Sequence, residues 1–139
     1  MLNTKREITI IKAVSFELGV VELRSDNILT FEPKEGYTTF NLEQIKLVNN
    51  VLIDVSGRIP RPYFSNNKNL KSLGSEEKIY IKDNIKNFAT AFAMTEDSAV
   101  TRFITYSFMQ LNRPSIPVKM FKTKEEAYEW LRTFNNQQE

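Results

Sequence analysis

The sequence predicts an α/β fold. One domain begins with an N-terminal β-hairpin and continues with alternating helices and strands, so that a mainly parallel central sheet is packed with about four helices. Three observations support this prediction. Residues 88–94, Phe-Ala-Thr-Ala-Phe-Ala-Met, are almost continuously apolar, which is typical of a strand buried on both faces. Residues 41–57 and 123–134 combine capping residues with apolar side chains at helical spacing. The alternation of helices and strands between them favours parallel strands joined by right-handed crossovers.

The composition indicates an ordinary globular domain and excludes several kinds of site. The 139 residues contain no repeat or linker, so residues 1–139 are predicted as a single domain, with residues 1–12 as a frayed or edge segment and residues 135–139 as a polar tail. The absence of cysteine and histidine excludes disulfides, Ser-His-Asp or Cys-His catalysis, and metal sites built on thiolate or imidazole. A net charge of +2 is too small to indicate nucleic-acid binding.

Neither a leader peptide nor a membrane span is expected. The first twelve residues contain no long apolar stretch and no small-residue cleavage site. No apolar run approaches the roughly 18 residues that a membrane helix needs. A cytoplasmic, bacterial-type protein is therefore the simplest interpretation.

The N-terminal part is predicted to form a hairpin. In residues 14–24 apolar side chains stand at every second position from Val14 to Val20, which predicts one strand with a buried face. Residues 25–27, Ser-Asp-Asn, favour a turn, and residues 28–32 return as the second strand.

A capped helix and a short strand follow. Asn41 is expected to cap the helix with Gln44 at the spacing of a capping box, and Gly57 to end it. Its apolar positions are Leu42, Ile45, Val48, Leu52 and Val55. Residues 58–62, Arg-Ile-Pro-Arg-Pro, cannot be helical because of their two prolines, and residues 63–65 are a short strand candidate.

Two further helices surround the buried strand. Ser75 is expected to start the second helix, with Glu76 and Glu77 at the positive end of its dipole. Its imperfect apolar face consists of Ile79, Ile81, Ile85 and Phe88. After a capping region at residues 95–98, residues 100–111 are predicted as a third helix. Its apolar stripe consists of Val100, Phe103, Ile104, Phe108 and Leu111.

The chain closes with a strand and a helix. Residues 118–121 are the last predicted strand, and Thr123 with Glu126 forms a second capping box. One apolar face of the last helix contains Ala127, Trp130, Leu131 and Phe134.

Three stretches share motifs with a known fold. Residues 57–62 precede Tyr-Phe-Ser as a Gly-x-Pro-x-Pro-like entry into a third strand. Residues 91–94, Ala-Phe-Ala-Met, look like a fourth strand. Residues 117–121 and 126–131 look like a closing strand with its Ala-x-x-Trp-Leu helix. In this order they resemble the STAS fold of anti-sigma-factor antagonists, and most of all small STAS-like bacterial proteins, whose fold is also similar to the lipid-binding CRAL-TRIO domain. The likeness spans most of residues 14–134.

The resemblance does not extend to a phosphorylation motif. Phospho-switch antagonists carry Asp-Ser-Ser-Gly after the third strand, whereas residues 65–75 read Ser-Asn-Asn-Lys-Asn-Leu-Lys-Ser-Leu-Gly-Ser, and Asn66 stands where related proteins often have Asp. Ser72 and Ser75 are phosphoacceptor candidates by position alone. A phosphate at Ser75 would interact favourably with the helix dipole, but the two glutamates that follow would repel it. A role as helix N-cap explains Ser75 equally well.

The same segment contains four cations and no acidic residue. Arg58, Arg61, Lys68 and Lys71 lie between Gly57 and the second helix, beyond the carboxyl end of a predicted parallel strand, where ligands bind in open α/β sheets. With Ser75 they form a candidate contact surface for an anion, a phosphoprotein or an acidic partner. Ordinary solvated surface charge explains these residues as well.

An apolar cavity under the C-terminal helices is the second candidate site. Its lining would come from Phe103, Tyr106, Phe108, Trp130, Phe134, Met94, Met109 and Met120. Such a cavity would suit a lipid or another small ligand, although an aromatic stripe at helical spacing more often forms core.

We therefore expect a non-enzymatic regulatory or scaffolding domain, related to signalling, that acts through protein contacts at the basic loop. The alternative is a small-molecule or lipid-binding module with an apolar pocket under the aromatic helices. No cofactor site, metal-binding spacing or catalytic carboxylate pair stands out, because Glu125, Glu126 and Glu129 are explained by capping and by a solvated helix face. The identity of the protein partner and the formation of a homodimer stay open.

Overall fold

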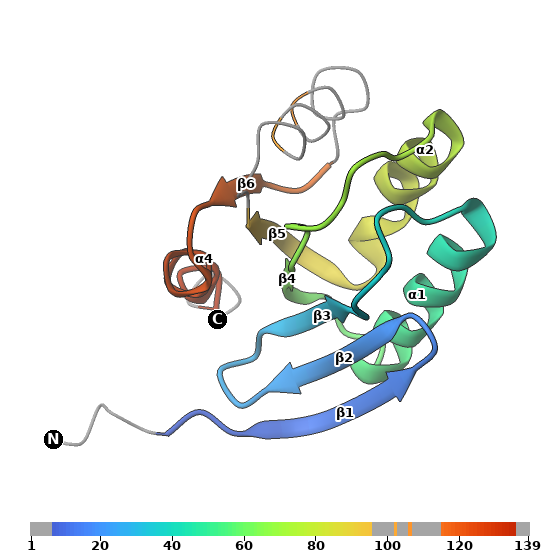
Figure 1. Cartoon of the computed structure of the whole chain (residues 1–139). Coiled ribbons are helices and arrows are strands. Elements are labelled where there is room, and N and C mark those ends of the chain that lie inside the picture. The colour runs from blue at the N-terminus through green and yellow to red at the C-terminus, as the bar shows by residue number, and fades with distance from the viewer. Residues whose placement is uncertain (1–6, 96–101, 103–105, 107–114, 136–139) are drawn as a thin grey trace, which may run out of the picture.

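The computed structural model describes residues 7–95, 102, 106 and 115–135, and its elements follow the predicted alternation (Figure 1). The strands are β1 (Ile10–Phe16), β2 (Gly19–Arg24), β3 (Leu29–Pro33), β4 (Arg61–Ser65), β5 (Ala89–Thr95) and β6 (Val118–Phe121). The helices are α1 (Leu42–Val55), α2 (Ser75–Asn84), the 3-10 turn η1 (Ile85–Asn87) and α4 (Lys124–Arg132). The five apolar positions of the helix predicted over residues 100–111 lie outside the described residues.

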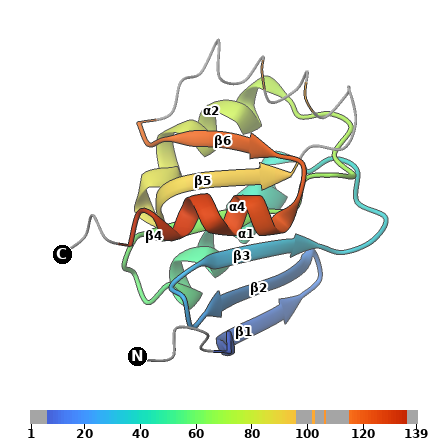
Figure 2. The same cartoon turned by 90° about the vertical axis from the view of Figure 1, so that its left-hand side faces the viewer.

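The strands form one six-stranded mixed sheet in chain order, from β1 to β6. β1, β2 and β3 pair antiparallel, whereas β3 to β6 pair parallel. Figure 1 shows α1 and α2 on one face of the sheet and α4 on the other, and Figure 2 shows the strands side by side behind α4. The predicted α/β class, with an N-terminal hairpin and a mainly parallel sheet, is confirmed.

The single strand predicted over residues 14–24 is wrong, because the chain turns back within it. β1 and β2 are separate antiparallel strands joined at residues 17–18. Gly19 makes this turn possible: its φ is +153°, and a Cβ there would lie 2.2 Å from the carbonyl oxygen of Glu32. The turn also shifts the alternation by one residue, so that Val21 is fully buried and Val20 is only partly so. Residues 10–12 belong to β1, an edge strand of the sheet.

The capping predictions hold for α1 and only in part for α2. Asn41 and Gln44 form the capping box of α1, and Gly57 follows its end in a left-handed conformation with φ of +73°. α2 begins at Ser75 as predicted, but its N-cap is Gly74, so Ser75 is the first helical residue and not the cap. No residue of α2 is buried, and Ile79, predicted for its apolar face, is 46% exposed. α2 therefore covers the sheet loosely.

The core lies in two clusters, one on each face of the sheet. β5 runs between β4 and β6 and is buried on both faces, as its apolar sequence predicts. Its Phe92 and Met94 belong to the cluster on the α1 and α2 face, and its Ala91 and Ala93 to the cluster that contains Leu131 of α4. The small alanine side chains let α4 approach the sheet closely, whereas the opposite face is filled by larger aromatic residues.

An ionic network fixes α4 to the turn between β2 and β3. The carboxylate of Asp26 accepts hydrogen bonds from Arg24 (2.9 Å) and from Arg132 of α4 (3.1 Å). The Arg24 guanidinium also lies 3.9 Å from the centre of the Tyr128 ring. Burial favours a raised pKa for Asp26, but the hydrogen bonds and charges of the two arginines outweigh it and hold the pKa below its ordinary value.

Candidate functional site

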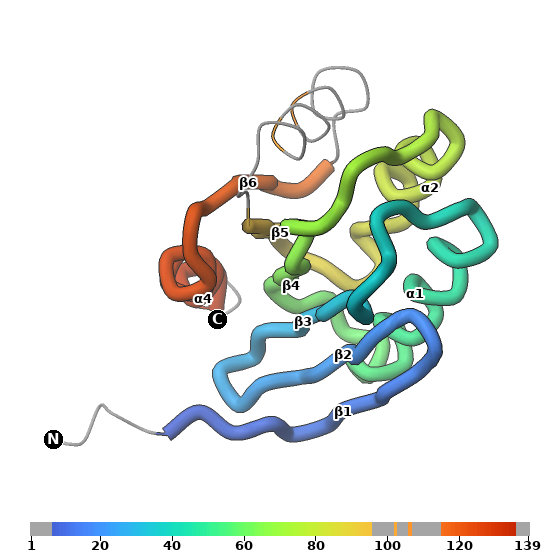
Figure 3. The backbone as a smooth tube through the Cα atoms, in the orientation of Figure 1, coloured from blue at the N-terminus to red at the C-terminus, as the bar shows by residue number. Residues whose placement is uncertain are grey.

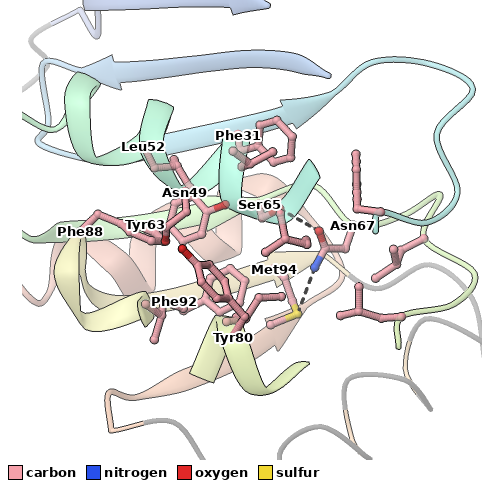
Figure 4. Close-up of a pocket in the computed structure, with 17 residues that line it drawn as sticks. Phe31, Asn49, Leu52, Tyr63, Ser65, Asn67, Tyr80, Phe88, Phe92 and Met94 are labelled. Carbon is pink, nitrogen blue, oxygen red and sulfur yellow. Dashed lines mark hydrogen bonds between the residues drawn. The ribbon is translucent and has the colours of Figure 1, made fainter. Parts of the chain in front are cut away.

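A cavity of about 120 Å³ lies between the sheet and the α1 and α2 helices (Figure 4). Three neighbouring parallel strands, the two helices and the segment 66–74 surround it. The side chains from the strands are Phe31 of β3, Tyr63 and Ser65 of β4, and Phe92 and Met94 of β5. They share one face of the sheet because strand side chains alternate with a period of two. The cavity thus lies where the loosely packed α2 leaves the aromatic face of the sheet incompletely filled.

An aromatic stack forms the floor of this cavity. The Tyr63 and Phe92 rings lie 4.9 Å apart between centres at an angle of 15°, and Phe88 meets Tyr63 edge-on at 5.2 Å. Such offset and edge-to-face contacts contribute about 0.5–1.5 kcal/mol each beyond the burial of apolar area. The floor is therefore built of aromatic rings that hold one another in place.

Asn49 of α1 is the unusual polar residue in this lining. It is 8% exposed and stands among the buried positions of α1, beside Val48 and Leu52. In the part of the chain that the structure describes, its side chain makes no hydrogen bond, and its two amide atoms stay accessible from the cavity and are not sealed in the core. Its amide therefore offers one acceptor and two donor hydrogens at the cavity.

The other polar groups of the lining are neutral. Figure 4 shows Asn49, Tyr63 and Tyr80 on one side of the cavity, and Ser65 and Asn67 with Met94 on the other. Ser65 Oγ donates to Asn67 Oδ1 (2.7 Å), and Asn67 Nδ2 donates to the sulfur of Met94 (3.5 Å). Burial raises the pKa of the Tyr63 hydroxyl, and a side-chain hydrogen bond with Ser65 lowers it by less, so the phenol stays protonated at neutral pH.

The cavity opens toward the segment 66–74 and α2. Its lining residues on the strands are buried, whereas Leu70, Leu73 and Tyr80 keep part of their surface exposed. The segment 66–74 runs beside the connection between β3 and α1 (Figure 3). Two hydrogen bonds join them: Lys71 N donates to Thr38 O (2.7 Å), and Thr39 Oγ1 donates to Ser72 O (2.9 Å). This segment is therefore one wall of the entrance.

The structure divides the basic residues singled out from the sequence into two groups. Arg58 and Arg61 lie at the amino end of β4, where the Arg61 guanidinium donates to Ser56 O (2.8 Å) and to Asn27 Oδ1. Lys68 and Lys71 lie beyond the carboxyl end of the same strand and are exposed, as are Ser72 and Ser75. The two groups lie at opposite ends of β4, so the four cations do not share one surface.

Asn66 follows β4 at the position where related STAS-like proteins often have Asp, and it has a structural role here. It is buried; Thr95 Oγ1 donates to its Oδ1 (3.0 Å), and its Nδ2 donates to the Glu32 carboxylate. Glu32 in turn pairs with Lys124 of α4 (3.3 Å). These bonds tie β3, β4 and β5 together at their carboxyl ends.

The structure describes only some of the aromatic residues and methionines that were expected to line a pocket. Phe103, Phe108 and Met109 lie outside the described residues. Trp130 and Phe134 pack edge-to-face at 4.8 Å on the α4 face, and Tyr106 is exposed. Of the predicted set, Met94 lines the cavity on the α1 and α2 face.

Sequence reasoning missed Asn49, Tyr63 and Tyr80. A signal for Asn49 was present: it lies four residues after Ile45 and three before Leu52, inside the apolar stripe of the first helix.

Two other kinds of site receive no support from the described ranges. Within residues 7–95 and 115–135, acidic side chains do not gather in threes to hold a metal ion. None of the helices that the structure describes has the length and apolar character to cross a membrane.

Comparison with known proteins places the chain in a family. A family model described as "Domain of unknown function (DUF7793)" matches residues 21–135, which is most of the chain. The chain belongs to the DUF7793 family. The match begins in β2 and ends just beyond α4, so it includes every element around the cavity. No curated protein matches the chain.

A solved structure shows the relation of this DUF7793 domain to a known fold. The crystal structure of an uncharacterised protein from the DUF3478 family with a SpoIIAA-like fold, from Shewanella loihica PV-4, matches with a TM-score of 0.55. The two chains are 14% identical, and the match covers 94% of this chain and 98% of that one. The STAS-like fold predicted from the sequence motifs is thereby confirmed.

Proposed function

We propose that this domain binds a small, mainly apolar molecule in the cavity beneath α1 and α2 and acts as a non-enzymatic regulatory module. The observation that carries the proposal is the Asn49 amide, which is nine-tenths buried, faces the cavity and has no hydrogen-bond partner among the described residues. The amide atoms are accessible from the cavity, so a ligand that pairs with them would take the place of water there and gain a directed hydrogen bond. A preformed concave site with mostly apolar walls and a few convergent polar groups is the usual form of a small-molecule site.

The lining suits recognition better than catalysis. The polar side chains described there are amides and hydroxyls, from Asn49, Ser65, Asn67, Tyr63 and Tyr80. General acid–base catalysis works best with a group whose pKa lies near the working pH, and burial moves the Tyr63 pKa away from neutrality. These groups can orient a ligand without exchanging protons with it.

A contact with a protein partner is the second proposed function, and the segment 66–74 supports it. Leu70 and Leu73 of this segment line the cavity, whereas Lys68 and Lys71 on the same segment face solvent. A ligand packed against the two leucines would restrict the backbone that carries the two lysines. Ligand binding would thus regulate a contact with an acidic partner.

Native mass spectrometry of the full chain tests the first function. We expect a co-purified small molecule on the wild type that is lost in Leu73→Trp, because the indole would fill the entrance. Leu47→Trp is the matched control, since Leu47 lies on α1, is exposed and does not line the cavity. A co-purified mass that persists equally in both variants would show that the ligand binds elsewhere.

A pull-down with two sets of variants tests the second function. The double change Lys68→Ser and Lys71→Ser should release an acidic partner, whereas Arg58→Ser should not, because Arg58 is an exposed cation at the opposite end of β4. If the partner survives the double change, the segment 66–74 is not the contact surface.

A further inference from the structure

We infer that the ligand, given the proposed binding function, is a neutral molecule about the size of one aromatic ring that carries a single hydrogen-bonding group directed at Asn49. This inference follows from three properties of the cavity: its volume, the charge of its lining and the shape of its floor.

The volume limits the ligand to a few non-hydrogen atoms. An apolar protein cavity of about 150 Å³ is large enough to hold benzene. The present cavity, at about 120 Å³, is close to that size. A long acyl chain does not fit inside it, so the lipid that the CRAL-TRIO resemblance offers as an alternative is not the expected ligand.

The lining favours an uncharged ligand. Every described residue that lines the cavity is apolar or carries a neutral amide or hydroxyl. A buried carboxylate or ammonium would lose its hydration without meeting an opposite charge there. The nearby Lys46 is exposed, and its Nζ lies 5.9 Å from the centre of the Tyr80 ring, so this ammonium stays in contact with water.

The floor and Asn49 together favour a flat ring with one polar group. The floor is aromatic, because Tyr63, Phe88 and Phe92 line it, and another ring can pack against the edges of these rings. Asn49 supplies a donor and an acceptor from α1, so a hydroxyl or amide on the ring can satisfy it. Phenol has this combination, toluene lacks the polar group, and benzoate adds a charge.

Titration of the full chain with phenol, toluene and benzoate, followed by calorimetry and by the shift in melting temperature, tests the inference. We expect phenol to bind about tenfold more tightly than toluene, the ratio that one net hydrogen bond supplies. Benzoate should bind more weakly than either. In Asn49→Leu the preference for phenol should disappear while toluene still binds. Asn50→Leu, a change at the next and exposed residue of α1, should leave the three affinities unaltered.

The outcomes separate this inference from the proposed function. If toluene or benzoate binds as tightly as phenol, the ligand class is wrong although the cavity still binds ligands. If none of the three binds at millimolar concentration and the protein purifies without a ligand, the proposed binding function fails as well.

Discussion

Replacing Asn49 by Leu is expected to stabilise the protein while it removes the polar recognition group of the cavity. Asn and Leu have similar branching and length, so the change replaces an amide by methyl groups with little change of shape. Asn49 lies within the apolar face of α1, where its neighbours Val48 and Leu52 are buried. A residue that lowers stability at a site suited to ligand binding is the expected signature of function.

The expected rise in the free energy of unfolding of Asn49→Leu has two contributions, and both are stabilising. The Asn49 amide is held in a mostly apolar lining but stays accessible to water in the cavity, so removing it relieves a cost below the about 1–3 kcal/mol of a fully buried unpaired amide. A nearly buried Leu adds apolar burial, up to about 1.5–3 kcal/mol for a full side chain. The adjacent space of about 120 Å³ leaves room for the methyl groups, so no overpacking opposes the gain. We expect the free energy of unfolding to rise by about 1–2 kcal/mol and the melting temperature by about 3–10 °C.

Urea unfolding followed by tryptophan fluorescence measures this effect. The chain has one tryptophan, Trp130, which lies on α4 across the sheet from Asn49 and reports global unfolding without touching the changed site. Asn50→Leu is the matched control and should change stability by less than about 0.5 kcal/mol, because its side chain is exposed. A loss of more than 1 kcal/mol in Asn49→Leu, with Asn50→Leu neutral, would refute the reasoning, since it would mean that the amide is paired in the folded protein.

Three further predictions concern the fold. Asp26→Asn should lower stability by about 1–3 kcal/mol at pH 7 through loss of charged hydrogen bonds to two arginines. The folded pKa of Asp26 is depressed, so its contribution to stability is present above the unfolded pKa of about 3.9 and is lost as the pH falls through the lower folded value. Thermal melts in which the difference between wild type and variant fails to shrink as the pH is lowered below the unfolded pKa would contradict this. Gly19→Ala should lower the free energy of unfolding by at least about 3 kcal/mol, because its Cβ would meet the Glu32 carbonyl oxygen. Gly36→Ala is the control: Gly36 has φ of +104° and no atom within 4 Å of the added Cβ, so the loss should be only the backbone strain of about 1–2 kcal/mol. Equal losses of stability in urea unfolding would show that no clash occurs at Gly19. Asn41→Ala should cost about 1 kcal/mol in the same assay through loss of the α1 cap, and an unchanged midpoint would show that the capping box contributes nothing.

The predictions that held rest on interactions between residues close in sequence. The capping box of Asn41 and Gln44 joins residues three apart. Thr123 is the N-cap of α4 and accepts a hydrogen bond from the backbone of Glu126 (3.2 Å), but the return bond of the predicted second capping box is not formed there. The central strand was predicted because burial on both faces needs an uninterrupted apolar run. The error at the first strand arose because the alternation of apolar residues continues through the turn that Gly19 allows, and the pattern alone does not show the reversal of direction.

The sequence by itself determined the fold class, the caps of α1 and α4, the buried central strand and the exclusion of cysteine and histidine chemistry. Only the tertiary structure decided where a site can form. It brought Asn49 of α1, Tyr63 of β4 and Tyr80 of α2 to the lining of one cavity, and it put the length of β4 between Arg58 and the exposed lysines. The physical reason is that a cavity forms where side chains from segments far apart in the chain do not fill the space between them. Here it arises because no residue of α2 is buried against the aromatic face of the sheet, which no local pattern encodes.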